Sequence, residues 1–224
     1  MNAGLTVRLK TLCSLLFRVK TFADVGCDHG YCTRYMLENE LCERATITDI
    51  SAECLKKAET LLREYIRAGR CDSLCTNGLK GVDENVDLVL IAGMGGMEIV
   101  HILTGEGGFV PKNFVLQPMR DARAVRETLL SRGARIERDF TFLDGKYYEV
   151  ISGSRSEERE EYTQAELDFG KENIRTPGVD FGNFLREEIG KKKNVLSRPL
   201  SDLARVETEE KIKYLQGVLS GEIK

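Results

Sequence analysis

The residues best suited to chemistry lie in a short acidic segment, Ala23-Asp-Val-Gly-Cys-Asp-His-Gly30, which follows an apolar stretch. Its two glycines let the backbone approach a ligand closely, because no side chain intervenes. Asp49 ends a second apolar stretch about 20 residues further on, where nucleoside-binding βαβ units place a carboxylate that accepts hydrogen bonds from a ribose. This spacing predicts a site for a ligand that contains a ribose.

The acidic segment does not have the three glycines with which dinucleotide-binding proteins cradle a pyrophosphate, and Asp28 would repel a phosphate there. S-adenosylmethionine contains a ribose and no phosphate, and its cationic sulfonium and ammonium groups would tolerate Asp24 and Asp28. We therefore favour this cofactor. Another nucleoside or nucleotide ligand, and a turn that binds nothing, are the alternatives on these residues alone.

Two later segments also place polar or glycine residues directly after an expected strand. Asn77 and Gly78 follow an expected strand, and the Asn77 side chain can accept a hydrogen bond from an adenine amino group, although Asn-Gly is also an ordinary turn. Ile91-Ala-Gly-Met-Gly-Gly-Met97 puts three glycines after a central strand, where ligands of open α/β sheets bind. We expect its backbone to line the place where the methyl group of the donor meets the acceptor.

The elements that would position these segments alternate between strand and helix after an amphipathic helix at residues 5–16. Strands are expected at 21–25, 45–50, 71–75, 86–92 and 113–117, with helices at 31–39, 51–68, 96–103 and 121–131. Strands at 134–143 and 147–153 flank Asp144-Gly145, a hairpin signal. The order predicts an α/β fold with a Rossmann-like sheet that is mostly parallel and has an antiparallel C-terminal hairpin.

Beyond residue 154 the pattern becomes helical and charged. Helices are expected at 157–173, around 181–189, and at 200–220, with breaks at Pro177-Gly178 and Arg198-Pro199. We predict two domains, a Rossmann-like domain over 1–154 and a helical one over 155–224. The second is expected to be a helical hairpin or a short coiled-coil arm.

Composition narrows the class of protein. The 224 residues are 42% apolar and 31% charged with a net charge of −3, and no apolar run is long enough for a membrane span. With no secretory leader evident, we expect a cytoplasmic protein. Seven cysteines without a C-x-x-C pair, and two histidines, favour reduced thiols and no metal site. Basic side chains at the N-terminus, at 120–126 and at 191–193 could contact phosphates, or they could be ordinary solvated surface.

The sequence resembles the bacterial tRNA (adenine(22)-N1)-methyltransferases over residues 5–153. The likeness is carried by five segments, Leu5 to Leu16 leading into Ala23-Asp-Val-Gly-Cys-Asp-His-Gly-Tyr31, Asn77-Gly-Leu79, Ile91-Ala-Gly-Met-Gly-Gly96, Leu116-Gln-Pro118 and Asp144-Gly-Lys-Tyr-Tyr-Glu149. The resemblance implies a class I methyltransferase fold with a C-terminal coiled-coil arm. It also implies transfer of a methyl group from S-adenosylmethionine to adenine N1 in the D-loop region of tRNA.

The resemblance and the motifs together assign candidate roles. The expected catalytic residues are Asp28 and His29. The expected cofactor-binding residues are Asp24, Gly26, Cys27, Asp28, Gly30, Asp49, Ile50, Asn77, Gly78, Ala92, Gly93 and Met94. The expected substrate-binding residues are Gly95, Gly96, Gln117, Pro118, Tyr31, Tyr147, Arg120 and Arg123. tRNA is the expected partner of a monomeric protein.

The sequence departs from the family pattern at three positions. The family usually has a small hydroxyl residue in place of Cys27, alanine in place of Gly30, and a carboxylate in place of Asn77. Asparagine replaces a charge-assisted hydrogen bond with a neutral one, so cofactor affinity is expected to be lower. A class I methyltransferase with another substrate, or an inactive homologue that binds cofactor or RNA, is the alternative reading.

Overall fold

The computed structural model describes residues 5–158 and 160–224. Its strands are β1 (Val19–Val25), β2 (Cys42–Asp49), β3 (Cys71–Cys75), β4 (Leu88–Met94), β5 (Asn113–Pro118), β6 (Ala134–Asp144) and β7 (Lys146–Arg155). Within the described residues they form one sheet in the order β3-β2-β1-β4-β5-β7-β6. The first five pair in parallel, and β7 runs antiparallel to both β5 and β6. The prediction of a mostly parallel sheet with an antiparallel C-terminal hairpin is confirmed.

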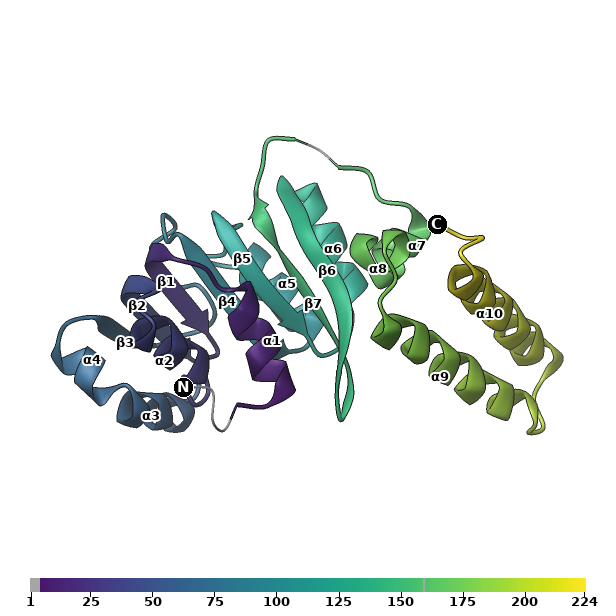
Figure 1. Ribbon diagram of the computed structural model, residues 1–224, viewed down its shortest axis with the longest axis horizontal. Coiled ribbons are helices and arrows are strands. Elements are labelled where there is room, and N and C mark those ends of the chain that lie inside the picture. The colour runs from purple at the N-terminus through teal and green to yellow at the C-terminus, as the bar shows by residue number, and fades with distance from the viewer. Residues whose placement is uncertain (1–4, 159) are drawn as a thin grey trace.

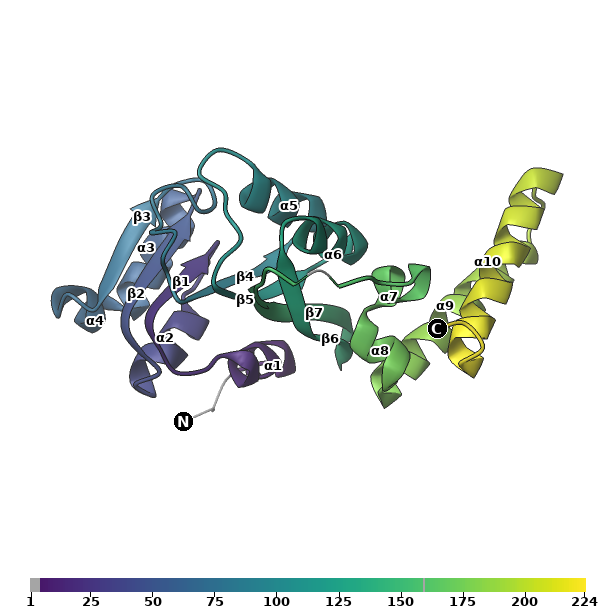
Figure 2. The same cartoon turned by 90° about the horizontal axis from the view of Figure 1, so that it is seen from above.

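Helices cover both faces of this sheet (Figure 1, Figure 2). They are α1 (Val7–Leu15), α2 (Tyr31–Glu38), α3 (Ala52–Leu61), α4 (Arg63–Arg67), α5 (Gly96–Thr104) and α6 (Ala122–Ser131). Apolar side chains of α1, α2 and α3 pack in one core cluster, and those of α5 and α6 pack in another. Figure 2 shows α1 on one side of the sheet and α5 and α6 on the other.

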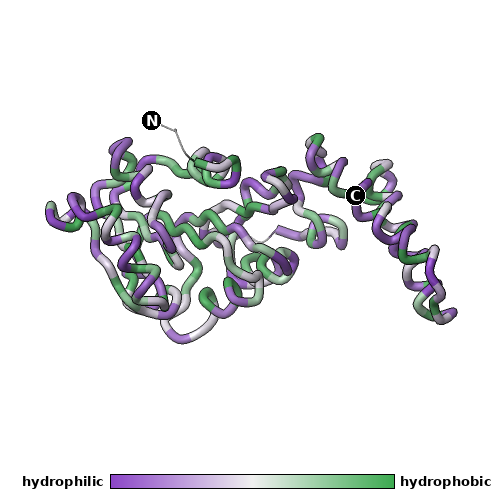
Figure 3. The backbone as a smooth tube through the Cα atoms, turned by 90° about the horizontal axis from the view of Figure 1, so that it is seen from below, coloured by the Kyte–Doolittle hydropathy of each residue, from purple (hydrophilic) through white to green (hydrophobic). Residues whose placement is uncertain are grey.

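The apolar run in β4 explains the two cores. Leu88 and Leu90 belong to the cluster under α1, α2 and α3, whereas Val89 and Ile91 belong to the cluster under α5 and α6. Successive side chains of a strand point to opposite faces, so a strand buried on both sides is apolar without alternation. Figure 3 shows the hydrophobic colour concentrated along the strands in the middle of the molecule.

Several predicted element boundaries in this part are wrong, and two of the differences have a clear structural cause. The single helix expected at 51–68 is divided at Leu62, whose side chain is fully buried where α3 gives way to α4. The strand expected to end at Ala92 continues to Met94. Gly93 adopts a φ of +84° at an irregularity in the pairing, which lets Met94 pair with Pro118.

The C-terminal helices project from the β6 edge of the sheet (Figure 1). They are α7 (Gln164–Phe169), α8 (Lys171–Arg175), α9 (Val179–Leu196) and α10 (Asp202–Ser220). Helices α9 and α10 lie side by side and share a third apolar core with α7, formed by Ala165, Phe181, Leu185, Ile189, Ile212, Leu215 and Val218. The helical hairpin is confirmed, whereas its coiled-coil character and the division at residue 154 stay predictions.

The helix expected at 157–173 is wrong at its start and in its middle. Helix α7 begins only after Thr163, whose hydroxyl accepts from the Glu166 backbone while the Glu166 carboxylate accepts from the Thr163 backbone, a capping box that fixes the helix start. Gly170, with a φ of +94°, then separates α7 from α8. A Cβ at this position would lie 2.4 Å from an Asp139 carboxylate oxygen, so only glycine fits the close approach of the two segments.

A buried arginine joins these helices to the sheet. The Arg126 side chain is fully buried and donates to both Asp139 carboxylate oxygens at 2.9 and 2.8 Å and to Glu149 at 2.6 Å. It also donates to the backbone oxygens of Leu167 and Asp168. Burial raises the pKa of Asp139, and the adjacent Arg126 guanidinium opposes that rise. The expectation that Arg126 contacts phosphate is therefore wrong, because its donors are engaged inside the protein.

A second connection lies at the surface beside the first. Arg123 forms an ion pair with Asp168 at 2.6 Å, and the Tyr214 hydroxyl of α10 donates to the same carboxylate at 2.7 Å. Arg138 of β6 forms two hydrogen bonds of 2.9 Å with Glu172 of α8. The arm is thus tied to the sheet by charged groups as well as by packing. None of the helices in the described residues has both the length and the apolar character needed to cross a membrane.

Candidate functional site

The loop after β1 is built from backbone conformations that favour glycine. Gly26 and Gly30 have φ values of +69° and +73°, and Asp28 between them has a φ of +47°. The backbone N–H groups of Gly26 and Cys27 donate to the Thr48 oxygen at 2.8 and 3.0 Å, which holds the loop against β2. A non-glycine residue in this region is uncommon and strained, and such strain gathers at functional sites.

Asp49 lies at the carboxyl end of β2, next to this loop. Its Oδ2 accepts from the Asp28 backbone N–H at 3.3 Å, and its Oδ1 accepts from the Ser51 N–H at 2.8 Å. The side chain is half-buried, so its oxygens have lone pairs left for a further donor. The predicted proximity of Asp49 to the β1 loop is therefore present in the structure.

Asp24 lies beneath the loop rather than in it. It is 5% exposed, and Thr33 Oγ1 donates to its carboxylate at 2.7 Å. Burial raises the pKa of Asp24 from 3.8 to about 6, and the charge of Asp49 adds to the rise. Cys27 and Gly30 are buried in the same region, and burial raises the pKa of the Cys27 thiol.

A cavity of about 570 Å³ opens at the carboxyl ends of β1, β2 and β4. In the sheet order β4 lies beside β1 while β2 lies on its other side, so this is the point at which the chain changes direction across the sheet. Nine of the residues expected to bind the cofactor line it, namely Gly26, Asp28, Asp49, Ile50, Asn77, Gly78, Ala92, Gly93 and Met94. The remaining three, Asp24, Cys27 and Gly30, are buried and do not line it.

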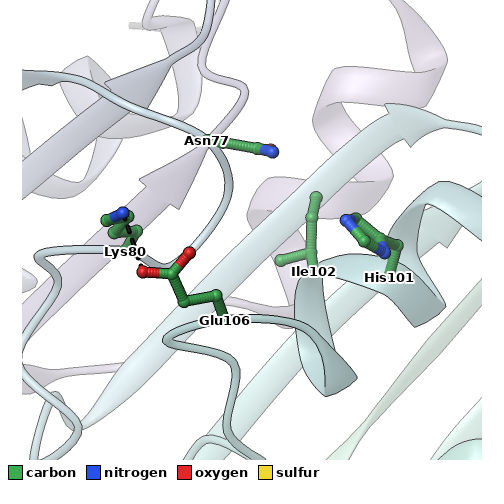
Figure 4. Close-up of a pocket in the computed structure, with 5 residues that line it drawn as sticks. All are labelled: Asn77, Lys80, His101, Ile102 and Glu106. Carbon is green, nitrogen blue, oxygen red and sulfur yellow. Dashed lines mark hydrogen bonds and ion pairs between the residues drawn. The ribbon is translucent and has the colours of Figure 1, made fainter.

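A smaller hollow of about 320 Å³ adjoins this cavity and shares Asn77 and Ile102 with it. Figure 4 shows Asn77 extending from the loop after β3 toward Ile102 and His101 of α5, with Lys80 and Glu106 paired at the side. The Lys80–Glu106 ion pair measures 2.9 Å and both side chains are exposed. Asn77 therefore stands between two connected spaces, with an exposed amide.

Other cavity-lining side chains were not among the expected site residues. They are Arg8 of α1, Glu98 of α5, Met119 after β5 and Tyr148 of β7, among others. Arg8 and Tyr148 lie in segments that carry the family resemblance, but only the packing of α1 and β7 brings their side chains to the cavity.

The two residues expected to act in catalysis are exposed at the mouth of the β1 loop. His29 Nε2 lies 3.8 Å from Asp28 Oδ1, and their side chains are 48% and 64% exposed. The His29 ring stacks on Tyr31 with centroids 5.6 Å apart. Asp28 lines the cavity, whereas neither His29 nor Tyr31 does.

The residues expected to bind substrate are scattered. Gln117 and Pro118 are buried, and Gln117 Oε1 accepts from Arg8 Nη1 at 3.0 Å. Tyr147 packs edge-on against Phe184 of α9, whereas its neighbour Tyr148 lines the cavity. Gly95 precedes α5 and Gly96 begins it. A Cβ on Gly96 would lie 2.4 Å from the Asp121 oxygen, which accounts for glycine there by packing.

The arginines expected to contact tRNA differ in availability. The Arg120 side chain is 80% exposed and lies 3.6 Å from Asp121. Arg123 is engaged with Glu127 and Asp168. Arg120 is thus the better placed of the two for an external anion.

Comparison with known proteins places this geometry in a family. Residues 5–151 match the model of a family described as a methyltransferase domain. A Bacillus subtilis relative named tRNA (adenine(22)-N(1))-methyltransferase is 30% identical over 173 residues, which cover 74% of this chain and 71% of that protein. A Mycoplasma pneumoniae relative with a provisional tRNA methyltransferase name is 32% identical over 124 residues, or 54% of this chain and 58% of that protein. The chain thus spans somewhat more than half the length of the Mycoplasma protein.

Solved structures resemble the chain over almost its whole length. The structure of M. capricolum TrmK with the cofactor product S-adenosyl-homocysteine is 21% identical, covers 98% of this chain and 99% of its own, and gives a TM-score of 0.85. Sp1610 from Streptococcus pneumoniae is 22% identical, covers 96% and 99%, and gives a TM-score of 0.88. At these identities the likeness establishes a shared fold, which includes the helical arm.

Proposed function

The chain belongs to the bacterial tRNA (adenine(22)-N1)-methyltransferase family, and from this premise we propose that it transfers a methyl group from S-adenosylmethionine to N1 of an adenine in tRNA. The position, adenine 22 in the D-loop region, follows the activity named for the Bacillus subtilis relative. S-adenosyl-homocysteine bound to the M. capricolum protein supports the choice of cofactor.

The observation that carries the proposal is the arrangement of Asp49, the Asp28 backbone and the loop glycines around one cavity. Asp49 keeps acceptor capacity for the two hydroxyls of a ribose. The carboxylates that line the cavity, Asp28, Asp49 and Glu98, favour a ligand with positive charge and disfavour a pyrophosphate. A ribose with a cationic substituent fits this donor and acceptor set.

The reaction requires little chemical participation by the protein's side chains. Bound S-adenosylmethionine supplies an electrophilic methyl group on a sulfonium, which a nucleophile displaces in line. Adenine N1 already has a lone pair, so the side chains need not remove a proton before attack. The protein's task is to align the base with the methyl group and to exclude competing water.

The methylated base carries a positive charge, which a nearby carboxylate stabilises. Asp28 is the candidate, because it lines the cavity and stands at the exposed end of the β1 loop. We assign to it electrostatic stabilisation of the developing cation. His29 is assigned to orient Asp28, since its ring lies 3.8 Å from that carboxylate and is braced by Tyr31.

The target N1 lies on the pairing edge of adenine and must be exposed before transfer. Gly95 and Gly96 follow the strand that ends at the cavity, and we propose that their backbone lies beside the base. Tyr31 is 44% exposed and offers a stacking surface at the loop. Tyr147 is assigned instead to packing against Phe184 of α9. Gln117 and Pro118 are assigned to the buried wall of the cavity, where Gln117 accepts from Arg8.

Phosphate contacts are proposed for Arg120 and for the lysines at 192 and 193 near the tip of the arm. Lys191 is engaged with Glu187 and Glu188 at 2.8 and 2.9 Å, so it contributes less. Replacing Lys192 and Lys193 with alanine is expected to lower tRNA affinity and reduce the slope of log affinity against log salt by about two. The matched control replaces Lys56 and Lys57 on α3; an equal loss in the control would contradict the assignment.

The deciding experiment is mass spectrometry of nucleosides after tRNA is incubated with the protein and methyl-labelled cofactor. We expect labelled 1-methyladenosine, and none from a tRNA in which adenine 22 is replaced by guanine. Cofactor binding without any methylated nucleoside would identify an inactive homologue. Label in another nucleoside would identify a methyltransferase with a different substrate.

We further propose that the protein acts as a monomer in the cytoplasm, where its tRNA substrate is found. In this proposal the two predicted domains have different roles. Residues 1–154 bind the cofactor, and residues 155–224 make additional contacts with tRNA. Size-exclusion chromatography with light scattering tests the monomer.

A further inference from the structure

Arg8 enters the cavity from α1, although it was not among the residues expected to bind the cofactor. It is the second residue of α1, its side chain is half-buried, and it lines the cavity. Its Nη1 donates to Gln117 Oε1 at 3.0 Å, and the guanidinium lies 5.8 Å from the centre of the Tyr148 ring. A Cβ on Gly93 would lie 3.2 Å from the same nitrogen, so the guanidinium is close to the β4 backbone.

Two other contacts fix this position. The Arg8 backbone N–H donates to Asp144 Oδ2 at 2.9 Å, which ties the start of α1 to the turn of the β6–β7 hairpin. The Gln117 amide nitrogen donates to the Pro118 oxygen at 2.9 Å, so the amide oxygen is directed at Arg8. Gln117 is thus a positioning residue for Arg8, although sequence reasoning had expected it to bind substrate.

The cavity around Arg8 is lined by more carboxylates than cations. The ionisable side chains among the described residues lining the cavity are the carboxylates Asp28, Asp49 and Glu98, the cation Arg8 and the neutral phenol of Tyr148. Within residues 5–158 and 160–224, no carboxylate lies within 4.0 Å of the guanidinium, whose side-chain partner is a neutral amide. A guanidinium has five N–H donors, so donors remain available for an anion.

We propose that Arg8 binds the carboxylate of the amino-acid portion of the cofactor, and this inference rests on the proposed function. S-adenosylmethionine carries two cationic groups, a ribose and one carboxylate. Asp49 at the end of β2 and Arg8 over Gly93 of β4 lie on opposite sides of the end of β1. A ligand whose ribose meets Asp49 and whose carboxylate meets Arg8 crosses the β1 loop at Gly26, where the backbone leaves space.

A carboxylate fits this place better than a phosphate of RNA. The guanidinium is half-buried and shares its cavity with three carboxylates, which repel a phosphodiester but attract the ammonium and sulfonium that accompany the cofactor carboxylate. Arginine binds a carboxylate through two parallel hydrogen bonds, which its planar fork allows and a lysine does not.

The test compares two ligands by isothermal titration calorimetry in the absence of RNA. One is S-adenosylhomocysteine, and the other is its decarboxylated analogue, 5′-(3-aminopropylthio)-5′-deoxyadenosine. The wild-type protein is expected to prefer the first by about 10- to 100-fold, the value of a charge-assisted pair. Arg8→Ala is expected to bind both with affinities within about threefold of each other, and Arg8→Lys to retain an intermediate preference.

Lys10→Ala is the matched control, because Lys10 is an exposed cation on the same helix and does not line the cavity. It should keep the wild-type preference. Arg8→Gln provides a second variant of similar length if Arg8→Ala does not fold. A wild-type preference in Arg8→Ala or Arg8→Gln overturns the proposal while leaving the proposed function intact.

Two further outcomes separate this inference from the proposed function. If the wild-type protein binds neither ligand, the cofactor assignment fails, and the role of Arg8 fails with it. If the preference collapses in the Arg8 variants but no tRNA is methylated, Arg8 is supported and only the proposed reaction is overturned.

Discussion

At the scale of single residues, the site depends on a few carboxylates held in different environments. Asp49 is half-buried with lone pairs to spare, Asp28 is exposed on a strained backbone, and Asp24 is buried beneath both. Desolvation and hydrogen bonding therefore give three acids of one type three different tasks. Sequence spacing predicted all three as cofactor residues but could not rank their depth.

Asp49→Asn tests the ribose contact. The amide oxygen can still accept from the Ser51 N–H, so the start of α3 is preserved, but the amide nitrogen cannot accept from a hydroxyl. Affinity for S-adenosylhomocysteine should fall by about 10- to 100-fold, measured by calorimetry. Asp72→Asn on β3, an exposed carboxylate paired with Arg44, serves as the control and should bind normally. Unchanged affinity in Asp49→Asn would remove the ribose assignment.

Asp24→Asn tests the buried acid through the pH dependence of stability. The pKa of Asp24 is raised to about 6 in the folded protein, so the folded state holds its proton more tightly than the unfolded state. The free energy of unfolding of the wild-type protein therefore falls as the pH rises from about 4 to about 6, by about 3 kcal/mol at most. Asparagine avoids this loss and can still accept from Thr33.

Urea unfolding of both proteins across this range measures the difference. The advantage of Asp24→Asn over the wild type should grow from below about 1 kcal/mol at pH 4 to about 3 kcal/mol at pH 7. A difference that does not change with pH would show that Asp24 is not held protonated by burial.

At the scale of elements, glycine conformation determines where the backbone can meet a ligand. Gly26 has a φ of +69°, and a Cβ there would lie 1.8 Å from the Met94 side chain. Gly145 in the β6–β7 turn has a nearly equal φ of +71°, but nothing lies within 4 Å of a Cβ at that position. A side chain at Gly145 would meet only backbone strain, whereas one at Gly26 would meet the same strain and a steric clash as well.

Alanine substitutions at these positions form a matched pair. Both should lose about 1 kcal/mol of stability, since alanine disfavours positive φ. Gly26→Ala should in addition displace Met94 into the cavity and weaken S-adenosylhomocysteine binding at least about tenfold, whereas Gly145→Ala should bind normally. Equal binding by the two variants would mean that the β1 loop does not approach the ligand.

Prediction from sequence succeeded where the signal was local and failed where it was not. Strand and helix alternation, the hairpin at Asp144-Gly145 and the glycine-rich strand ends each follow from short-range backbone preferences. The choice between Tyr147 and Tyr148 does not, because adjacent strand residues face opposite sides and only the packing of β7 against α9 decides which side is which. Arg8 was missed for the same reason, since its role depends on how α1 docks on the sheet.

At the scale of the whole molecule, the buried Arg126 makes the arm and the sheet one structural unit. It joins α6, β6, β7 and α7 through charged and backbone acceptors while fully excluded from solvent. Only a folded arm can supply the Leu167 and Asp168 oxygens, so the two parts depend on each other for the satisfaction of a buried charge.

Arg126→Ala leaves Asp139 buried without its partner. The free energy of unfolding should fall by about 3 to 5 kcal/mol, measured by urea denaturation, and the arm should become more susceptible to protease at the segment that leads into α7. Arg120→Ala, which removes an exposed guanidinium, should change stability by less than about 0.5 kcal/mol. A loss below about 1 kcal/mol for Arg126→Ala would show that the Arg126 contacts are not needed to hold the arm to the sheet.

The length of α9 has a consequence for what the protein can recognise. Its 18 residues span about 27 Å, so the tip of the arm lies about that far from the contacts that tie the arm to the sheet. An RNA fragment carrying only the target loop could enter the cavity yet leave the tip without a contact. Selection among RNAs would then depend on their overall dimensions as well as on the nucleotides around the modified base.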